Sequence, residues 1–442
     1  MCKWLLAAAV AFAAETASAE PVLMISIDGL QPADVINAEA RGIDAPNLRA
    51  IMTEGAYAAG VVDVLPSVTY PNHTTLITGV APALHGISSN TVFDPLREND
   101  GGWYWYETDI RMPTLWDAVS QSGGSVASIG WPVSVGARAI DWNIPEFWRA
   151  HTAEDLKLVE ALSTEGLVAE LEAASGVSFS ELQSEEVTSD VARAKFAASL
   201  IALKHPQFMT LHLVSLDHFE HEDGPNSQKA IATLEAIDKA VGELVATARA
   251  AEPDLVVAVV SDHGFAAISQ STNLIIPFIE AGLITYDAEK KAVTAWEAMP
   301  WGAGGSAAIV LTRPNDKKLK KQVAALLAKL AADPALKIRR VIDAKEIEKA
   351  GGAKEASFWV DFTPGVSSMG YRLEGDVVAP SGGKGTHGFF PGNPEMRASF
   401  FISGPGVPQG RNLGEVDMRA IAPTIAMRLG VKLGAAEVRP LF

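Results

Sequence analysis

Short, continuous apolar runs are spaced widely along this chain, and each of them ends at turn-forming or polar residues. The four clearest runs are rich in aliphatic and β-branched side chains and cover residues 22–27, 208–214, 255–260 and 398–402. Strands that are buried on both faces give this kind of unbroken apolar pattern. The four runs therefore predict buried parallel strands.

Segments with helical periodicity fill much of the chain around these runs. The predicted helices cover residues 47–54, 114–121, 153–174, 187–204, 227–251, 317–332 and 418–429. Strands that alternate with helices predict an α/β fold with a doubly wound, mostly parallel sheet and helices on both faces. Because no linker rich in Pro, Gly and Ser divides the chain, we predict one large domain over residues 20–442, with residues 266–385 as an inserted cap.

The first nineteen residues have a different pattern. Lys3 precedes an apolar run over residues 4–14, and Ala17-Ser18-Ala19 is a sequence that a signal peptidase accepts. We predict a signal peptide over residues 1–19 and a periplasmic or secreted protein. A membrane anchor fits less well, because the apolar run is shorter than the ~20 residues that span a bilayer. Cleavage would also remove Cys2, so the mature chain has no thiolate for catalysis or metal binding.

The composition excludes several classes of protein. With 48% hydrophobic and 20% charged residues among 442, the chain is globular and not disordered. The formal net charge of −17 opposes binding to the phosphate backbone of a nucleic acid. We therefore expect a small substrate and no nucleic-acid polymer, no stable membrane span after signal cleavage, and an oligomeric state that the sequence leaves open.

Three of the predicted strands are followed by carboxylate and imidazole side chains. Asp28 follows the first run, Asp262 and His263 follow the third, and Asp217 and His221 come shortly after the second. The last two are four residues apart and share one face if that segment is helical. Each aspartate alone could equally cap the next helix, so the prediction rests on three strand ends meeting at one edge of a sheet.

A sixth candidate ligand, His387, lies in the glycine-rich segment 382–388. Three carboxylates and three imidazoles form a mixed oxygen and nitrogen set, which suits zinc or a neighbouring first-row metal better than calcium. Six ligands exceed the requirement of one catalytic zinc. The sequence therefore predicts a site for two metal ions.

The candidate nucleophile lies in segment 66–79, which contains four threonines. Pro71 can open a helix, which would place Thr69 immediately ahead of its amino end, where free N–H groups favour an anion. A threonine hydroxyl is a poor nucleophile unless a metal ion promotes its ionisation. Capping of the helix is the alternative role for Thr69.

The chain resembles the nucleotide pyrophosphatase/phosphodiesterase family of the alkaline phosphatase superfamily. The resemblance is carried, in order, by residues 25–30 (ISIDGL), 69–73 (TYPNH), 79–90, 93–95 (FDP), 131–132, 217–221 (DHFEH), 261–264 (SDHG), 386–388 (THG) and 422–426. It implies an alkaline-phosphatase-like fold and two zinc ions as cofactors. In this family pattern one ion is held by Asp28, Thr69, Asp262 and His263, and the other by Asp217, His221 and His387.

The resemblance also implies roles around the phosphate. Asn90 matches the family's asparagine that donates a hydrogen bond to a non-bridging phosphoryl oxygen. Tyr70 occupies the place of a family aromatic residue that flanks the leaving nucleoside, so it is a predicted substrate-binding residue. His212 stands where the opposite wall of that slot is usually tyrosine, and this departure weakens the expectation of nucleobase stacking.

These features predict a metal-dependent phosphoric ester hydrolase that cleaves a small phosphodiester or nucleotide through a phosphothreonine intermediate. An alkaline phosphomonoesterase of the same superfamily is one alternative, although the Lys-x-Arg pair of the family's threonine-type monoesterases is absent from residues 129–138, where Arg138 is the nearby cation. An inactive binding protein of the same fold is another alternative, but no expected site residue is missing.

Overall fold

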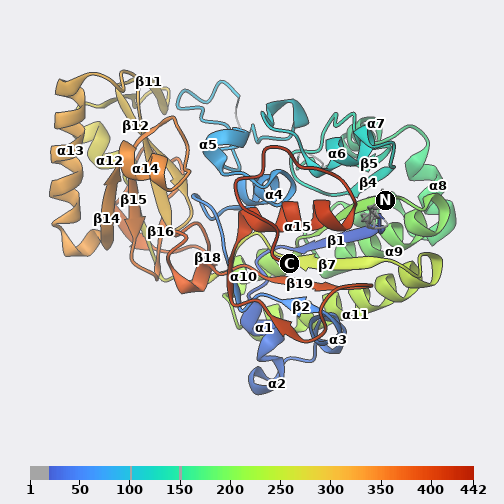
Figure 1. Ribbon diagram of the computed structural model, residues 1–442. Coiled ribbons are helices and arrows are strands. Elements are labelled where there is room, and N and C mark those ends of the chain that lie inside the picture. Colours follow the sequence, from blue (N-terminus) through green and yellow to red (C-terminus); the bar gives the residue numbers. More distant parts are fainter. Residues whose placement is uncertain (1–18, 100–101, 149–151) are drawn as a thin grey trace, which may run out of the picture.

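The computed structural model describes residues 19–99, 102–148 and 152–442. An eight-stranded sheet forms the centre of the molecule (Figure 1), with the strand order β20-β2-β19-β7-β1-β6-β4-β5. The strands are β1 (Val22–Ile27), β2 (Ala56–Tyr57), β4 (Val126–Ile129), β5 (Trp142–Ile144), β6 (Phe208–Leu213), β7 (Val256–Val260), β19 (Phe400–Ser403) and β20 (Arg411–Asn412). The predicted α/β fold with a mostly parallel sheet is confirmed.

The five strands β7, β1, β6, β4 and β5 are parallel to one another. The fourth predicted run is also a strand, but its predicted parallel direction is wrong, because β19 pairs with β7 in antiparallel register from Phe400↔Val260 to Ser403↔Val257. The chain reaches β19 from the loop that holds His387, at the carboxyl edge of the parallel strands. A strand that enters the sheet at that edge has to run back along its neighbour.

Helices cover both faces of this sheet. One face packs against α3 (Pro46–Glu54), α9 (Val187–Lys204) and α11 (Gln228–Ala251), and the other against α4 (Thr69–Thr78), α6 (Leu115–Gln121) and α15 (Ile421–Arg428). Side chains of β1 alternate between the two cores, with Ile25 on the first face and Met24 on the second. The sheet is therefore buried on both sides, as its continuous apolar strands predict.

Most predicted helices are present within one or two residues of their expected bounds. The prediction of a single helix over residues 153–174 is wrong, because α7 (Ala153–Leu162) and α8 (Leu167–Ser175) are separated by a break at Gly166, whose φ is 75°. Residues 418–420 form a 3-10 turn ahead of α15. The other elements of the core are α1 (Pro32–Ile36), α2 (Ala38–Arg41), β3 (Gly60–Val62), α5 (Pro82–His85), α10 (Ser215–Asp223) and β21 (Glu415–Asp417).

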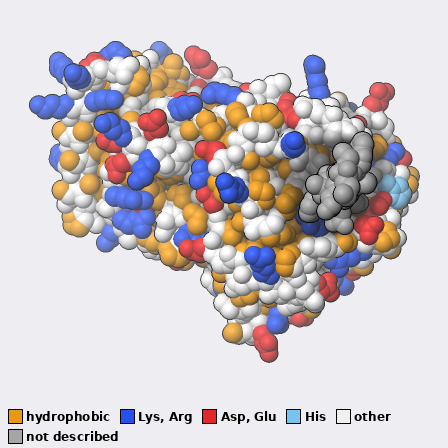
Figure 2. Space-filling view, in the orientation of Figure 1, with side chains coloured by type: hydrophobic (Ala, Val, Ile, Leu, Met, Phe, Trp, Pro, Cys, Tyr) orange, Lys and Arg blue, Asp and Glu red, His pale blue; other side chains and the backbone are white. Residues whose placement is uncertain are grey.

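Residues 266–385, which we call the cap, form a second lobe beside the core in Figure 1. The cap has more residues in strands than in helices and packs around its own hydrophobic cluster, whereas the sequence pattern predicted only a helix there, over residues 317–332. At its neck, β8 (Ala266–Ala267) pairs with β18 (Gly385–Thr386), so the chain enters and leaves the cap at one point. Figure 2 shows many Lys and Arg side chains on the cap, including the side that carries α13.

The central element of the cap is a four-stranded antiparallel sheet in the order β12-β13-β15-β14. Its strands are β12 (Ala298–Ala303), β13 (Ser306–Leu311), β14 (Ile338–Asp343) and β15 (Ala356–Phe362). The remaining cap elements are β9 (Gln270–Thr272), α12 (Ile275–Glu280), β10 (Ile284–Asp287), β11 (Ala292–Trp296), α13 (Lys317–Ala331), α14 (Ala344–Lys349), β16 (Val366–Ser368) and β17 (Val378–Pro380).

No helix of the described residues is both long enough and apolar enough to cross a bilayer. Except for Ala19, the predicted signal peptide lies outside the described residues.

Candidate metal centre and active site

The candidate ligands are brought together by three neighbouring parallel strands that end at the same level. Ser26 of β1 pairs with Val260 of β7, and Ile27 pairs with Leu213 of β6. Asp28 follows β1 directly, and its backbone N–H donates a hydrogen bond to the Leu213 carbonyl at 2.9 Å. The next residue, Gly29, donates its N–H to Asp262 Oδ1 at 3.3 Å. The carboxyl ends of β7, β1 and β6 therefore meet as predicted.

Asp28, Asp262 and His263 form the first group of potential ligands. His263 Nε2 lies 3.0 Å from Asp262 Oδ2 and 3.4 Å from Asp28 Oδ1. One ligand atom from each of the three residues lies within 4.8 Å of the others, and all three side chains are buried. A single ion can therefore contact all three.

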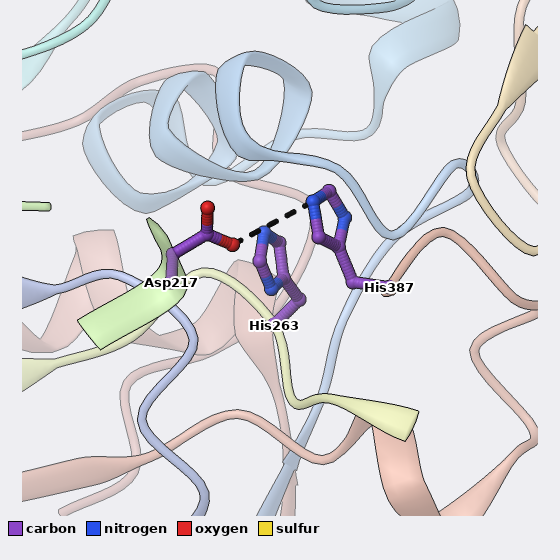
Figure 3. Close-up of side chains that lie close together, drawn as sticks. All are labelled: Asp217, His263 and His387. Carbon is purple, nitrogen blue, oxygen red and sulfur yellow. Dashed lines mark ion pairs between the residues drawn. The ribbon is translucent and has the colours of Figure 1, made fainter. Parts of the chain in front are cut away.

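Asp217, His263 and His387 form the second group, and Figure 3 shows the three side chains pointing toward one another. Asp217 Oδ1 lies 3.7 Å from His387 Nε2, and the rings of His263 and His387 stack with their centroids 3.7 Å apart. His221 is one helical turn beyond Asp217 on α10, and its Nε2 lies 3.5 Å from Asp217 Oδ2. The geometry thus places His263 between the two groups, whereas the family pattern assigns His221 to the second.

The hydrogen bonds of the three histidines leave the same ring nitrogen free. Nδ1 lies 3.1 Å from the carbonyl oxygen of Gly264 in His263, 3.0 Å from that of Gly385 in His221, and 3.0 Å from that of Ser67 in His387. Each Nδ1–H can therefore donate to a carbonyl, which leaves a lone pair on Nε2, the usual arrangement for a metal-binding imidazole.

The donor set fits divalent cations. Four of the atoms that face the centre are buried and have no hydrogen-bond partner among the described residues, namely Asp28 Oδ1, Asp217 Oδ1, Asp262 Oδ2 and His263 Nε2. Unpaired buried carboxylate oxygens are costly unless a cation satisfies them. Carboxylate and imidazole ligands with no thiolate match zinc and its first-row neighbours.

The electrostatics of the centre also call for positive charge. Burial, together with the charges of Asp262 and Asp217, raises the pKa of Asp28 well above its ordinary value. Burial alone would lower the pKa of His263, but the carboxylates of Asp262, Asp28 and Asp217 outweigh burial and raise that pKa to about 10. Without an ion, the site therefore retains protons that a divalent cation would displace.

Thr69 is the first residue of α4, and the structure differs here from the predicted helix start at Pro71. Val68 is the N-cap, and Pro71 occupies the third helical position, where its missing N–H costs no hydrogen bond. Thr69 is therefore not the helix cap that the alternative interpretation required. Asn90 Nδ2 lies 3.5 Å from Thr69 Oγ1, and Asn90 Oδ1 accepts a hydrogen bond from the Tyr70 N–H at 2.9 Å.

A second set of contacts ties Thr69 to the ligands. His73 Nδ1 lies 2.9 Å from the Thr69 carbonyl oxygen and 3.7 Å from Asp262 Oδ2, and its Nε2 lies 2.8 Å from Ser26 Oγ. Two residues ahead of Thr69, the Ser67 carbonyl accepts the hydrogen bond of His387. These contacts hold the backbone of Thr69 close to Asp262 of the first group and to His387 of the second.

The two predicted substrate-binding residues, Tyr70 and His212, are buried and do not line an open slot for substrate. The Tyr70 ring is completely buried, and it packs edge-on against Trp103 with centroids 5.2 Å apart. His212 is 1% exposed, and its Nε2 and Nδ1 lie 3.1 Å from Asp28 Oδ2 and 2.9 Å from Glu146 Oε2. In this structure His212 orients Asp28, because both of its ring nitrogens are engaged beneath the ligand.

Glu146 is the residue of this network that the sequence reasoning missed. It lies two residues beyond the carboxyl end of β5, in the same kind of position as the predicted ligands. Burial alone would lower the pKa of His212, but hydrogen bonds to Asp28 and Glu146 raise it to about 10. The strand-end rule would have found Glu146 if the three-residue strand before it had been recognised.

The carboxylates of the centre have no lysine or arginine partner within the described part of the chain. Each ion pair of Asp28, Asp217 and Asp262 there is with a histidine. Arg138, the nearby cation of the sequence, is exposed. Positive charge at this centre must therefore come from imidazoles or bound cations.

A buried carboxylate on a neighbouring helix fixes α10, which carries Asp217 and His221. Asp190 of α9 accepts hydrogen bonds from the N–H groups of Val214 and Ser215 at 3.0 and 2.8 Å, and it forms an ion pair with Arg193 at 2.7 Å. Asp190 is thus a distant cap for the amino end of α10, and the local sequence of α10 gives no sign of it.

Replacing Asp190 with alanine is expected to lower the free energy of unfolding by about 3–5 kcal/mol, since the change leaves a buried arginine unpaired and two N–H groups without an acceptor. Urea denaturation followed by circular dichroism measures the loss. Asp316, a partly exposed cap of α13, offers the control, and Asp316→Ala should cost clearly less. Equal losses in the two variants would contradict the role given to Asp190.

Comparisons with known proteins show which family model and which solved structures this chain matches. The family model for type I phosphodiesterase/nucleotide pyrophosphatase matches residues 22–390. An uncharacterised pyrophosphatase/phosphodiesterase of Schizosaccharomyces pombe is 26% identical over 253 residues, or 57% of this chain and 46% of the yeast protein. A venom phosphodiesterase of Macrovipera lebetinus is 23% identical to this chain. The match covers 51% of this chain and 23% of the venom protein. The chain matches less than half the length of these relatives.

Solved structures resemble the chain over nearly its whole length. Human ectonucleotide pyrophosphatase/phosphodiesterase 5 aligns with a TM-score of 0.64 and 18% identity, covering 93% of this chain and 96% of the human one. An inactive threonine-to-alanine variant of the murine protein, in complex with AMP, aligns with a TM-score of 0.64 and 17% identity over 94% of this chain and 96% of its own. These similarities confirm the alkaline-phosphatase-like fold.

Proposed function

Since the chain belongs to the type I phosphodiesterase/nucleotide pyrophosphatase family, we propose that it is a phosphodiesterase that uses two zinc ions and a phosphothreonine intermediate at Thr69. The observation that supports this most is the convergence of two ligand groups, which share His263, beside a threonine at a helix amino end. The proposal includes a secreted or periplasmic location, which the signal-like amino-terminal sequence favours.

The proposed ligands are Asp28, Asp262 and His263 for one ion and Asp217, His387 and His221 for the other, with Thr69 completing the first set. Zinc at these positions supplies positive charge that promotes ionisation of the threonine hydroxyl and offsets the charge of the phosphoryl oxygens. His73 fixes the carbonyl of Thr69, so the backbone that carries the hydroxyl is held in place before substrate arrives.

The chemical steps follow from the residues around Thr69. Its Oγ1 attacks phosphorus in line, a bond forms between Oγ1 and phosphorus, and the bond to the leaving alcohol or phosphate breaks on the opposite side. Asn90 Nδ2 donates a hydrogen bond to a non-bridging phosphoryl oxygen during this step. Water then attacks phosphorus, releases the Thr69 hydroxyl and completes the hydrolysis.

The backbone N–H of Tyr70 positions Asn90. Because it already donates to Asn90 Oδ1 at 2.9 Å, it orients the asparagine side chain and leaves Asn90 Nδ2 as the donor toward phosphate. The threonine-to-alanine variant of the murine relative is described as inactive, which is consistent with a threonine nucleophile in this fold.

We expect a diester to be hydrolysed with a higher kcat/KM than a monoester. A monoester dianion carries an additional charged oxygen, and this centre offers it no lysine or arginine among the described ion pairs of its carboxylates. Bis-p-nitrophenyl phosphate and p-nitrophenyl phosphate, compared on the same zinc-loaded preparation, measure the preference. The reverse ranking would move the assignment to a phosphomonoesterase.

A further inference from the structure

A cavity of about 350 Å³ lies between the cap and the loop that follows Asn90. Its lining includes Phe93 from the core loop and Leu274, Trp301, Met369 and Tyr371 from the cap. The metal ligands do not line this cavity, and the proposed chemical steps do not use it. Its position next to the phosphoryl site makes it a candidate for binding part of the substrate.

Both sides of the cavity adjoin the candidate active site. On the core side its lining begins at Thr91, the neighbour of Asn90. On the cap side it includes Gly304, which packs so closely on the ligand His387 that a Cβ at Gly304 would lie 2.2 Å from the His387 carbonyl oxygen. A group attached to a phosphorus atom beside Asn90 can therefore extend into the junction between core and cap.

The walls of the cavity present aromatic faces together with a few polar groups. The rings of Phe93 and Trp301 lie 5.3 Å apart at an angle of 50°, and Phe93 also packs edge-on against Trp296 behind it. The indole N–H of Trp301 is buried and has no hydrogen-bond partner among the described residues. Flat aromatic faces suit a planar ring, which can stack on them, better than they suit a flexible hydrocarbon chain.

The charges of the lining disfavour a cationic occupant. Arg97 adds a positive charge at 4.9 Å from the centroid of the Tyr371 ring. Asp94 is the carboxylate of the lining, and its two oxygens already accept hydrogen bonds from the N–H groups of Glu98 and Asn99. A quaternary ammonium group would meet Arg97 without a free carboxylate to balance it.

We propose that this cavity is a specificity subsite that binds an uncharged planar ring on the alcohol that stays on phosphorus in the first step. The inference rests on the proposed phosphodiesterase function. In-line displacement sends the leaving group away from Thr69, while the cavity begins next to Asn90, which lies beside Thr69. The retained group is therefore the one that faces the cavity.

Two esters with the same leaving group test this subsite, namely benzyl p-nitrophenyl phosphate and ethyl p-nitrophenyl phosphate. The wild-type enzyme should favour the benzyl ester in kcat/KM by roughly tenfold, the size of one stacking contact. Phe93→Ala and Trp301→Ala should bring this ratio close to one and leave the ethyl ester within about twofold of wild type. Trp142→Ala, on the strand β5 at the edge of the core sheet, should leave the ratio unchanged.

The outcomes separate the subsite from the proposed function. Absence of a benzyl preference in the wild type, or a preference that survives both substitutions, overturns the subsite while hydrolysis of the ethyl ester stands. Failure to hydrolyse either ester overturns the phosphodiesterase proposal itself. Phe93→Leu and Trp301→Leu, which keep an apolar side chain in place, serve as the test if an alanine variant loses cooperative thermal unfolding.

Two further esters identify the occupant. A stronger preference for octyl p-nitrophenyl phosphate than for the benzyl ester would show that the cavity binds an alkyl chain and not a planar ring, and would contradict the proposal. Thymidine 5′-p-nitrophenyl phosphate distinguishes the source of the ring, because a loss in both alanine variants assigns the nucleobase to the cavity. If the alanine variants keep their kcat/KM for the thymidine ester but lose it for the benzyl ester, the cavity binds a smaller aryl group.

Discussion

Replacing Thr69 with alanine is expected to lower kcat for bis-p-nitrophenyl phosphate by at least about 10³-fold, because the attacking oxygen is lost from the reaction. The Thr69 hydroxyl lies 3.5 Å from Asn90 Nδ2 at the amino end of α4, and no other hydroxyl is placed there by the contacts described above. Steady-state kinetics on zinc-loaded protein measures the effect. Binding of a product nucleotide or phosphate should persist, since the carboxylate and imidazole ligands stay in place.

Two matched variants show whether the loss is chemical. Thr69→Ser keeps a hydroxyl at the same position and should retain much of the activity. Thr78→Ala removes a buried hydroxyl from the same helix, one that donates to the Thr74 carbonyl at 2.7 Å, and should leave kcat close to wild type. Near-normal turnover by Thr69→Ala would leave Thr69 with no more than a structural role at the helix start.

Removal of metal is expected to abolish nearly all hydrolysis, with recovery on addition of zinc. Among the described residues, Asp28, Asp262 and His263 present buried atoms without hydrogen-bond partners, which bound cations would satisfy. Dialysis against 1,10-phenanthroline, followed by activity assays and metal analysis, measures the dependence. Thermal unfolding offers a second readout, since an ion that binds only the folded state raises the midpoint as its concentration rises above its Kd.

The thermal measurement has its own internal control. Asp262→Asn removes a ligand charge from the fully buried group, so its unfolding midpoint should respond much less to added zinc than that of the wild type. Full activity in a preparation shown to contain no transition metal would contradict the metal dependence.

The core of the fold could be predicted because its central strands are continuously apolar. β1, β6 and β7 are buried on both faces, so their sequences carry the pattern without interruption. The three-residue strand β5 is too short for any periodicity, and the direction of β19 depends on where the chain enters the sheet. The cap strands β12, β13 and β15 were not predicted although they are almost entirely buried, because small residues and Pro300 interrupt their apolar, β-branched pattern.

The convergence of the candidate ligands was predicted from the strand-end positions, but the place of His263 in both groups was not. His263 lies in both groups because its ring stacks on His387, a contact between residues 124 positions apart. The orientation of each ring depends on a carbonyl oxygen, such as those of Gly385 and Ser67, that only the tertiary structure brings near. Sequence spacing cannot encode these contacts, and for the same reason it could not reveal that Tyr70 is buried.

The most direct test of the central claim is a crystal structure of the purified protein with anomalous diffraction collected on both sides of the zinc absorption edge. The account predicts two zinc peaks, one among Asp28, Asp262 and His263 and one among Asp217, His221 and His387, with the Thr69 hydroxyl beside the first. A single peak, or none in crystals of active protein, would contradict it.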